Sequence, residues 1–442
     1  MNTTTEREPT AVAETPTQEG EVRARWAWAE PMVWTERMLT ALEKGVKGGK
    51  WFSLIDKVWK LENLESGWER VRRNKGSGGS DGQTIHQFER RKAEEIGRLA
   101  EELKAGTYQP RPIRRHWIPK PGEKRRRPLG IPTIRDRVAQ TALRNVLEPI
   151  FERDFSDTSY GFRPGRGCHG ALREVEAALK AGYGWVVDAD LRSYFDSIPH
   201  EKLMKEVENK IADGRVLELI RRYLKQNIME AMRQWTPENG TPQGAVISPL
   251  LANIYLDPLD RRMKAQGYRM IRYADDFVIL CKSEAEARNA LESVKAWVEE
   301  SGLALNPEKT KIVNATEKGG FDFLGFHFER GMKWPRRKSE KKFRDTIRKL
   351  TKRTNGNSLP TIISKLNPVM RGWFAYFKTG HHTTFRPLDS WVRMRLRSIL
   401  RKRIKLKGRG RGRDHQRWPN DFFAKHGLFS LTAAYEQACQ PW

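Results

Sequence analysis

The sequence predicts an α+β protein with more than one domain, and three observations support this class. The chain has 442 residues, which is enough for two or three compact domains. Apolar side chains recur at helical spacing near both ends of the chain. In the middle of the chain, by contrast, short apolar runs typical of strands alternate with helical segments.

The first third of the chain is predicted to be mostly helical. Residues 1–25 are polar with few large apolar side chains, so we expect them to be disordered. Residues 34–64 carry apolar side chains such as Leu39 and Leu42 at the spacing of short helices. The glycine-rich stretch 74–82 is predicted to be a loop. The remaining elements expected here are a helix over 85–104, an extended hairpin over 110–132 and a helix over 138–155.

The middle of the chain is predicted to alternate strands with helices, and the last part to be helical. We expect a strand at 184–190, helices at 200–209, 215–225, 248–264 and 284–301, a hairpin centred on 274–276 and a strand at 320–328. Four regions follow: an N-terminal extension at 1–50, an α+β region at 51–331, a helical region at 332–405 and a basic segment at 406–442.

Charge is the most informative feature of the composition. The formal net charge is +28, and residues 332–442 carry 28 Lys and Arg against 6 Asp and Glu, so they account for +22 of it. A segment this basic repels itself unless a polyanion neutralises it, and nucleic acid is the usual partner. No apolar run approaches the ~20 residues of a membrane span, and the acidic start is not a signal peptide. Three distant cysteines exclude a disulfide framework, so we expect a reducing cytoplasm.

Two acidic sites interrupt segments that should be apolar. Asp188 and Asp190 end the predicted strand 184–190, and Asp275-Asp276 lies at the tip of a hairpin between apolar strands. Adjacent carboxylates raise one another's pKa unless a cation neutralises them. Mg²⁺ prefers such oxygen ligands and takes substrate phosphates as further ligands. The alternative is an acidic hairpin turn without a metal, since Asp is common in turns.

Tyr273-Ala-Asp-Asp276 resembles the Tyr-X-Asp-Asp motif of reverse transcriptases, and other blocks of that family occur in the family's order. The similar blocks are Asp190 with Phe195 five residues later, Gly240-Thr-Pro-Gln-Gly-Ala-Val-Ile-Ser-Pro-Leu-Leu251, Leu305-Asn-Pro-Glu-Lys-Thr-Lys311 and Phe323-Leu-Gly-Phe326. The resemblance covers about residues 51–403. It implies a right-hand polymerase, with fingers and an antiparallel palm sheet flanked by helices in region 51–331 and a helical thumb in region 332–405.

This resemblance implies a two-metal mechanism. Two Mg²⁺ ions would activate the primer 3′-hydroxyl and stabilise the leaving pyrophosphate, with Asp190, Asp275 and Asp276 as their ligands. Asp188 shares a strand face with Asp190, so the spacing of the residues alone does not choose between them. The resemblance chooses Asp190 because of its distance from Phe195 along the chain.

The resemblance also implies that four residues contact the incoming dNTP. Phe195 is expected to be a steric gate against a ribose 2′-hydroxyl, with an ordinary core aromatic as the alternative. Gln243 is expected beside the sugar and base of the nucleotide. Lys120 and Arg127 are expected to cover the triphosphate, with a grip on the template RNA as the alternative for this basic cluster.

Further motifs resemble the proteins encoded by bacterial group II introns. They are Ile131-Pro-Thr-Ile-Arg-Asp-Arg137, Asp157-Thr-Ser-Tyr-Gly-Phe-Arg-Pro-Gly-Arg166, Asp196-Ser-Ile-Pro-His200 and the maturase-like Asn367-Pro-Val-Met-Arg-Gly-Trp-Phe-Ala-Tyr-Phe377. Val369, Trp373 and Tyr376 share one helical face, which we interpret as thumb core, with stacking on RNA bases as the alternative. The residues predicted to bind nucleic acid are Arg371, Trp373, Arg393, Arg397, Arg401 and Arg403.

The function implied is that of a reverse transcriptase and splicing maturase of a mobile intron. Its partners would be the intron RNA, an RNA template with a DNA or RNA primer, dNTPs and target DNA, the last in contact with segment 406–442. It would act in the bacterial cytoplasm, at the nucleoid when on DNA. Some relatives carry a zinc-bearing His-Asn-His endonuclease. Because this sequence shows no such motif, we expect it not to cut the second DNA strand and to insert at nicked or single-stranded DNA.

Two alternatives remain open at this point. One is a reverse transcriptase that serves DNA repair, phage defence or CRISPR spacer acquisition, which is distinguished by whether its gene lies inside an intron. The other is an RNA-binding splicing cofactor whose polymerase has decayed. The presence of Asp190, Asp275, Asp276 and Gln243 argues against decay, since RNA binding alone does not demand them.

Overall fold

The computed structural model describes residues 22–46, 48–119, 126–230, 233–406 and 412–439. The chain divides into two compact units, which we describe separately. The first consists of Met1–Ala171, Asp190–Asp276 and Glu292–Asn306, and the second of Leu172–Ala189, Phe277–Leu291 and Pro307–Trp442. Helices and mainly antiparallel sheets are mixed along the chain, which confirms the α+β class. None of the described helices is both long and apolar enough to cross a bilayer.

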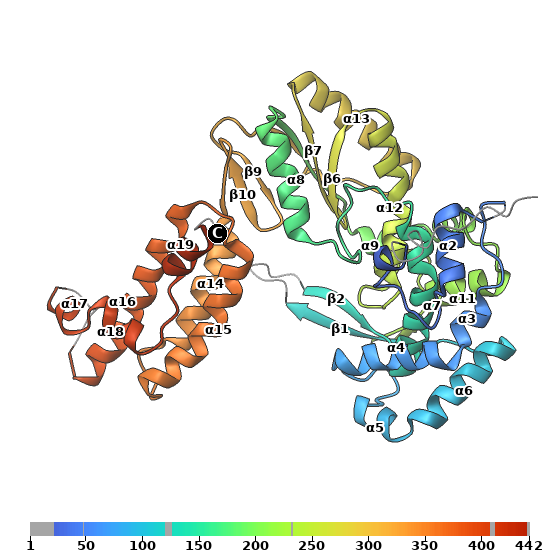
Figure 1. Cartoon of the computed structure of the whole chain (residues 1–442), viewed down its shortest axis with the longest axis horizontal. Helices are drawn as coiled ribbons and strands as arrows, with labels where there is room; N and C mark the ends of the chain where they lie inside the picture. The colour runs from blue at the N-terminus through green and yellow to red at the C-terminus, as the bar shows by residue number, and fades with distance from the viewer. Residues whose placement is uncertain (1–21, 47, 120–125, 231–232, 407–411, 440–442) are drawn as a thin grey trace, which may run out of the picture. The chain divides into compact units, whose positions relative to one another are not determined.

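Helix α7 (Ile134–Glu152), labelled in Figure 1, lies in the core of the first unit, and almost all of its residues are buried. Helix α4 (Leu61–Arg73) packs against it at Gly67, where an added methyl group would lie 3.0 Å from the Val138 carbonyl. Trp34 is fully buried, and its ring nitrogen donates to the Asn145 carbonyl at 2.9 Å, so part of the predicted N-terminal extension belongs to this core. The other helices of this part are α2 (Glu36–Lys44), α3 (Ile55–Trp59), α4 (Leu61–Arg73), α5 (Ile85–Arg90) and α6 (Lys92–Ala105).

One predicted helix is wrong in its length. The segment expected to be a single helix over 85–104 forms α5 and α6, which meet at Arg91 with φ −116° and ψ 22°. Thr84 and Gln87 form a capping box that begins α5, as the sequence pattern allows. The break lies within a charged, amphipathic stretch, so periodicity alone does not reveal it.

The predicted hairpin is confirmed as β1 (Ile113–Pro119) paired antiparallel with β2 (Arg126–Ile131). It belongs to a four-stranded sheet of order β2-β1-β4-β5, in which β4 (Ile228–Glu230) runs parallel to β1 and β5 (Arg233–Trp235) completes the edge. The first unit also contains β6 (Arg269–Tyr273) and four helices: α9 (Tyr194–Ser197), α10 (His200–Glu208), α11 (Gly214–Leu224) and α12 (Ser248–Ala265).

The second unit contains a sheet in which β7 (Asp276–Cys281), β3 (Trp185–Asp190) and β8 (Lys311–Asn314) lie side by side. Strands β3 and β8 pair antiparallel, with Asp188 opposite Lys311. Helix α8 (Cys168–Lys180) precedes β3 in the sequence, and no element was predicted there. Helix α13 (Glu284–Glu300) follows β7 and was predicted.

A three-stranded antiparallel sheet follows, where a single strand over 320–328 and then helix are predicted. Its strands are β9 (Phe321–Phe323), β10 (Phe326–Glu329) and β11 (Met332–Pro335). Leu324 and Gly325 have φ of 45° and 85°, so the chain reverses between β9 and β10. The sequence suggested a single strand because apolar residues alternate throughout this segment, and its four phenylalanines, Phe321, Phe323, Phe326 and Phe328, are all buried.

The helical thumb consists of α14 (Arg337–Leu350), α15 (Leu359–Phe377) and α16 (Phe385–Arg403), which Figure 1 shows in orange to red. Three shorter helices follow: α17 (Arg413–Arg417), α18 (Asn420–Lys425) and α19 (Leu431–Cys439). Phe423 and Leu431 are fully buried in the thumb core, and Asp389 of α16 accepts hydrogen bonds from the Leu431 and Thr432 amides at 3.0 and 2.9 Å. The described residues beyond 405 therefore pack as part of the thumb and not as a separate segment.

Candidate functional site

Asp275 lies in a tight turn between β6 and β7, and Asp276 begins β7. Ala274, the first residue of the turn, has φ +60°, a left-handed conformation that L-residues adopt only at a cost. Both aspartates are half-buried. Partial burial, as the larger cause, and a hydrogen bond with Cys168, as the smaller one, raise the pKa of the Tyr273 hydroxyl to about 12. This group therefore stays protonated at neutral pH.

A buried ion pair lies behind this turn. The Arg272 and Asp260 side chains are both fully buried, and the guanidinium donates to both carboxylate oxygens at 2.5–3.1 Å. Arg272 Nη1 also donates to Asn253 Oδ1 at 3.0 Å and to the Ala274 carbonyl at 2.9 Å. Burial lowers the pKa of Arg272, but attraction to Asp260 outweighs this and leaves the pKa above its ordinary value. The guanidinium therefore stays charged, and it fixes the turn through its hydrogen bond to the Ala274 carbonyl.

The loop around Gly161 presses against the same turn. A methyl group on Gly161 would lie less than 3.0 Å from the Ala274 nitrogen, so only glycine allows this approach. The Tyr160 amide donates to the Arg272 carbonyl at 2.8 Å, and Asn253 Nδ2 donates to the Gly161 carbonyl at 2.8 Å. The motif that contains this loop was noticed only through its resemblance to a family. The contacts give it a physical role, which is to support the turn that carries Asp275.

Asp190 lies at the end of β3 and is half-buried. Asn306 donates two hydrogen bonds to Asp190. Its backbone N–H donates to the Asp190 carbonyl at 2.8 Å, and its side-chain Nδ2 donates to Asp190 Oδ2 at 3.3 Å. Asp188, the other candidate, faces Lys311 Nζ at 3.9 Å. The two aspartates therefore differ in surroundings as well as in position, and Asp188 has a basic neighbour of its own.

Tyr194, four residues after Asp190, is buried and joins α9 to α12. Its hydroxyl donates to the Ala252 carbonyl at 2.6 Å. Burial raises the pKa of Tyr194 well above its ordinary value, the positive charge of Arg272 opposes the shift, and the negative charge of Asp275 adds to it. The pKa of Tyr194 therefore depends on its burial first and on Arg272 and Asp275 after that.

The structure brings Phe195, Gln243 and strand β2 together. The Thr241 amide donates to the Phe195 carbonyl at 2.7 Å, and the Gly130 amide donates to the Gln243 carbonyl at 2.6 Å. Loss of hydration raises the pKa of Asp196, and the positive charges of Arg115 and Arg127 oppose this shift. Arg127 therefore acts electrostatically beside the predicted gate. Lys120 lies outside the described residues.

The carboxylates are not clustered as a ready-made metal site. In the part of the chain that the structure describes, no three His, Cys, Asp or Glu side chains are grouped so that they could hold an ion. Mg²⁺ commonly binds one or two protein carboxylates and completes its ligands with substrate phosphates and water. The donor set of Asp190, Asp275 and Asp276 fits such an ion in its chemistry.

The thumb residues that were predicted to bind nucleic acid divide into two groups. Trp373 packs against Phe343 and Phe377 with ring centroids 4.8 Å apart in each pair, which agrees with the interpretation as thumb core. Arg397 is 2% exposed and donates to the Trp418 carbonyl and to Asn420 Oδ1, each at 2.9 Å. The prediction that Arg397 contacts phosphate is contradicted by this burial, because its guanidinium is used inside the thumb.

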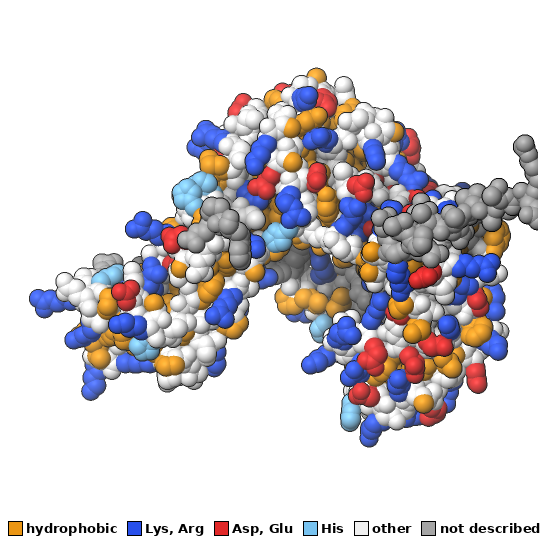
Figure 2. All heavy atoms as spheres, viewed as in Figure 1, with side chains coloured by type: hydrophobic (Ala, Val, Ile, Leu, Met, Phe, Trp, Pro, Cys, Tyr) orange, Lys and Arg blue, Asp and Glu red, His pale blue; other side chains and the backbone are white. Residues whose placement is uncertain are grey.

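The other predicted arginines lie nearer the surface. Arg371 is exposed and stacks over Phe429 at 5.5 Å, and Arg403 is exposed with a hydrogen bond to the Asn357 carbonyl. Arg393 donates to Ser390 at 3.4 Å, and Arg401 pairs with Asp414 at 2.6 Å. Figure 2 shows many Lys and Arg side chains over the thumb, with few acidic ones among them.

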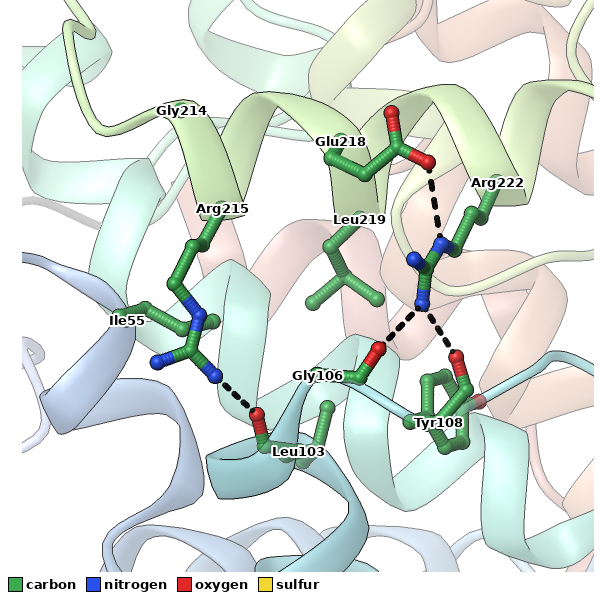
Figure 3. Close-up of a pocket in the computed structure, with 9 residues that line it drawn as sticks. All are labelled: Ile55, Leu103, Gly106, Tyr108, Gly214, Arg215, Glu218, Leu219 and Arg222. Carbon is green, nitrogen blue, oxygen red and sulfur yellow. Dashed lines mark hydrogen bonds and ion pairs between the residues drawn. The ribbon is translucent and has the colours of Figure 1, made fainter.

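A cavity of about 140 Å³ between α6 and α11 is lined by none of the predicted site residues (Figure 3). Arg215 donates to the Leu103 carbonyl at 2.7 Å, and Arg222 donates to the Gly106 and Tyr108 carbonyls at 3.0 and 2.7 Å. These arginines of α11 bond to carbonyls in the last turn of α6 and in the segment that follows it. The cavity is therefore a structural junction.

Comparison with known proteins gives two family matches. Residues 118–328 match the family "Reverse transcriptase (RNA-dependent DNA polymerase)", and residues 340–418 match "Group II intron, maturase-specific domain". Protein YkfC of Escherichia coli K12 is 38% identical over 56% of this chain and 74% of its own length. The group II intron-encoded protein LtrA of Lactococcus lactis subsp. cremoris is 44% identical over 38% of this chain, and the match spans only 28% of LtrA.

Among solved structures, a chain of a partial Cas6-RT-Cas1–Cas2 complex aligns with 56% of this chain and 41% of its own length, at 26% identity and a TM-score of 0.37. The maturase match begins in α14 and runs past residue 405 to the end of α17. The chain belongs to the family of group II intron-encoded reverse transcriptases with a maturase domain, and it is an RNA-directed DNA polymerase.

Proposed function

We propose that this chain copies RNA into DNA with Asp190, Asp275 and Asp276 as the ligands of two Mg²⁺ ions. Reverse transcriptase domains generally depend on divalent metal ions. The observation that carries the proposal is the buried Arg272 network, which fixes the turn bearing Asp275 and acts on Tyr194, four residues after Asp190. Burying two charges has a large desolvation penalty, and proteins tolerate it where a functional side chain must be held in a fixed position.

When bound, two such ions would activate the primer hydroxyl and stabilise the leaving pyrophosphate. The protein's own residues would then position the nucleotide. Arg127 would neutralise triphosphate charge, since it already acts on Asp196 beside Phe195. Phe195 would exclude a ribose 2′-hydroxyl, and Gln243 would contact the sugar and base. Lys120 is proposed as a second phosphate contact on its position in the sequence alone.

Substitution of Asp190 tests the metal site against a matched control on the same strand. Asp190→Asn should lower cDNA synthesis at least about 100-fold, because losing a ligand removes several kcal/mol of charge stabilisation. Asp188→Asn should retain most activity, because Asp188 faces Lys311. Primer extension on an RNA template measures both variants. The assignment is wrong if Asp188→Asn, and not Asp190→Asn, loses synthesis.

The thumb is proposed to bind the intron RNA and so assist splicing, with reverse transcription of the intron during its insertion into target DNA. The excess of positive charge over residues 332–442 supports this, as do exposed Arg371 and Arg403. We propose that these activities take place in the bacterial cytoplasm, at the nucleoid when DNA is bound.

Splicing of the intron RNA in the presence of the protein tests the proposed thumb function. An Arg371→Ala/Arg403→Ala variant should weaken RNA binding and splicing and make binding less sensitive to salt. Arg397→Ala is the comparison, and it should act through thumb stability, because Arg397 is buried. A native protein that copies RNA but promotes no splicing of the intron that encodes it would favour a role in DNA repair or defence.

A further inference from the structure

Phe162 combines two unfavourable features. Its side chain is 45% exposed, and its backbone has φ +61°, in the left-handed region that is strained for a bulky residue. A large apolar side chain in a strained conformation on the surface gains little for folding. Such a residue persists where the surrounding structure holds it for a purpose.

The loop that carries Phe162 is firmly held on both sides. Next to it, Arg163 has a side chain that is 2% exposed and forms a bidentate pair with Glu152, at 2.9 and 2.8 Å. Arg163 also donates to the Ser156 carbonyl and, at 2.7 Å, to the Ser159 carbonyl. On the other side, the Gly161 carbonyl accepts from Asn253. The backbone on both sides of Phe162 is therefore held by contacts with other parts of the first unit.

The Phe162 ring is directed at two residues of the proposed site. It meets Phe195 edge to face, with centroids 6.3 Å apart and planes at 76°, and it lies 6.4 Å from the Tyr273 ring. Tyr194 meets Phe195 as well, at 5.6 Å and 63°. Because Tyr194 is buried and anchored through its hydroxyl, Phe195 is supported by one buried ring and one exposed ring.

We propose that Phe162 is a positioning residue that holds Phe195 in the orientation that rejects ribonucleotides. A steric gate excludes a 2′-hydroxyl only if its ring cannot rotate away from the sugar. The edge-to-face contact with Phe162 favours the observed orientation of the Phe195 ring by up to about tenfold. This inference rests on the proposed role of Phe195.

The test measures kcat/KM for a deoxynucleotide and for the matching ribonucleotide on an RNA template. Phe162→Asn removes the ring but keeps a residue that tolerates left-handed backbone. It should lower the preference for the deoxynucleotide about 3- to 10-fold, mainly through faster ribonucleotide incorporation. Phe162→Tyr keeps an aromatic ring at this position and should retain the native preference for the deoxynucleotide. The control Phe52→Asn, at an exposed phenylalanine outside the site, should leave the preference unchanged.

Further variants separate this inference from the proposed gate. Phe195→Ala should lose the preference, and adding Phe162→Asn to it should change nothing more, because Phe162 acts through Phe195. If Phe195→Ala leaves the preference intact, both proposals fail. If Phe195→Ala loses it while Phe162→Asn does not, or if Phe162→Asn slows both nucleotides equally, only the role of Phe162 is refuted. Phe162→Gly relieves the backbone strain and gives the same readout should the Asn variant fold poorly.

Discussion

The buried Arg272–Asp260 pair gives the sharpest prediction for stability. Asp260→Asn leaves the Arg272 guanidinium charged and fully buried without its counter-ion. Removing one partner of a buried pair costs about 3–5 kcal/mol. Asn keeps one acceptor oxygen, and Arg272 keeps its bonds to Asn253 and the Ala274 carbonyl. We therefore expect the lower end of this range, a loss of about 3 kcal/mol in the free energy of unfolding.

Amide hydrogen exchange over β6 measures this loss within the first unit. A loss of about 3 kcal/mol should lower the protection of β6 amides about 100-fold. Glu300→Gln is the control, because it breaks the exposed Arg262–Glu300 pair at 2.8 Å and should cost under about 1 kcal/mol. Equal effects of the two variants would refute the reasoning.

Replacing both partners separates stability from function. The Arg272→Met/Asp260→Leu variant buries neither member of the pair as a charge, so its stability should exceed that of Asp260→Asn. Its cDNA synthesis should stay low, because the Ala274 carbonyl has lost the guanidinium that fixes the turn. Native synthesis by this double variant would show that Arg272 serves folding alone.

Two further predictions concern glycine positions and thiols. Gly161→Ala should abolish most cDNA synthesis, because its methyl group meets the Ala274 backbone, whereas Gly97→Ala in α6 meets nothing within 4 Å and should stabilise by about 0.5–1 kcal/mol; primer extension and thermal unfolding measure the two effects. Burial, with a contribution from Glu286, raises the pKa of Cys281 to about 12, so a thiol reagent at pH 8 should modify this cysteine only after unfolding, unlike the other two. Because this pKa is raised, the stability that the thiol contributes is complete below about pH 8.5 and is lost as the pH rises towards 12. Rapid modification of all three cysteines in the native protein would contradict the burial of Cys281.

Much of the fold follows from local patterns in the sequence. The helices α2, α3, α7 and α10 to α13 and the hairpin β1–β2 agree with the periodicity of apolar residues, whereas most of α4 lies beyond the predicted helical stretch 34–64. The break at Arg91 and the reversal at Leu324 and Gly325 were missed, because both depend on backbone dihedral angles within runs of regular polarity. The packing of Phe423 and Leu431 into the thumb was missed because the positive charge of that segment suggested an exposed surface.

The candidate site could be predicted only in part for a related reason. Paired carboxylates at the tip of a hairpin are visible in the sequence. The residues that hold them are not, because Asp260, Arg272 and Asn253 are joined by contacts between segments that are separate in the sequence. One signal was available, since an arginine inside an apolar strand next to an acidic turn needs a buried partner. Arg397 offered no such signal, because its neighbours one helical turn away include Arg393 and Arg401.

Primer extension on an RNA template with Mg²⁺ tests the central claim most directly, with native protein compared with an Asp275→Ala/Asp276→Ala variant and binding of the same RNA measured in parallel. We predict cDNA from the native protein and none from the variant, with unchanged RNA affinity, because binding rests on the basic surfaces and not on the carboxylates. Extension by the variant would contradict the assignment of the metal site. Absence of synthesis by the native protein would instead leave RNA binding as the chain's activity.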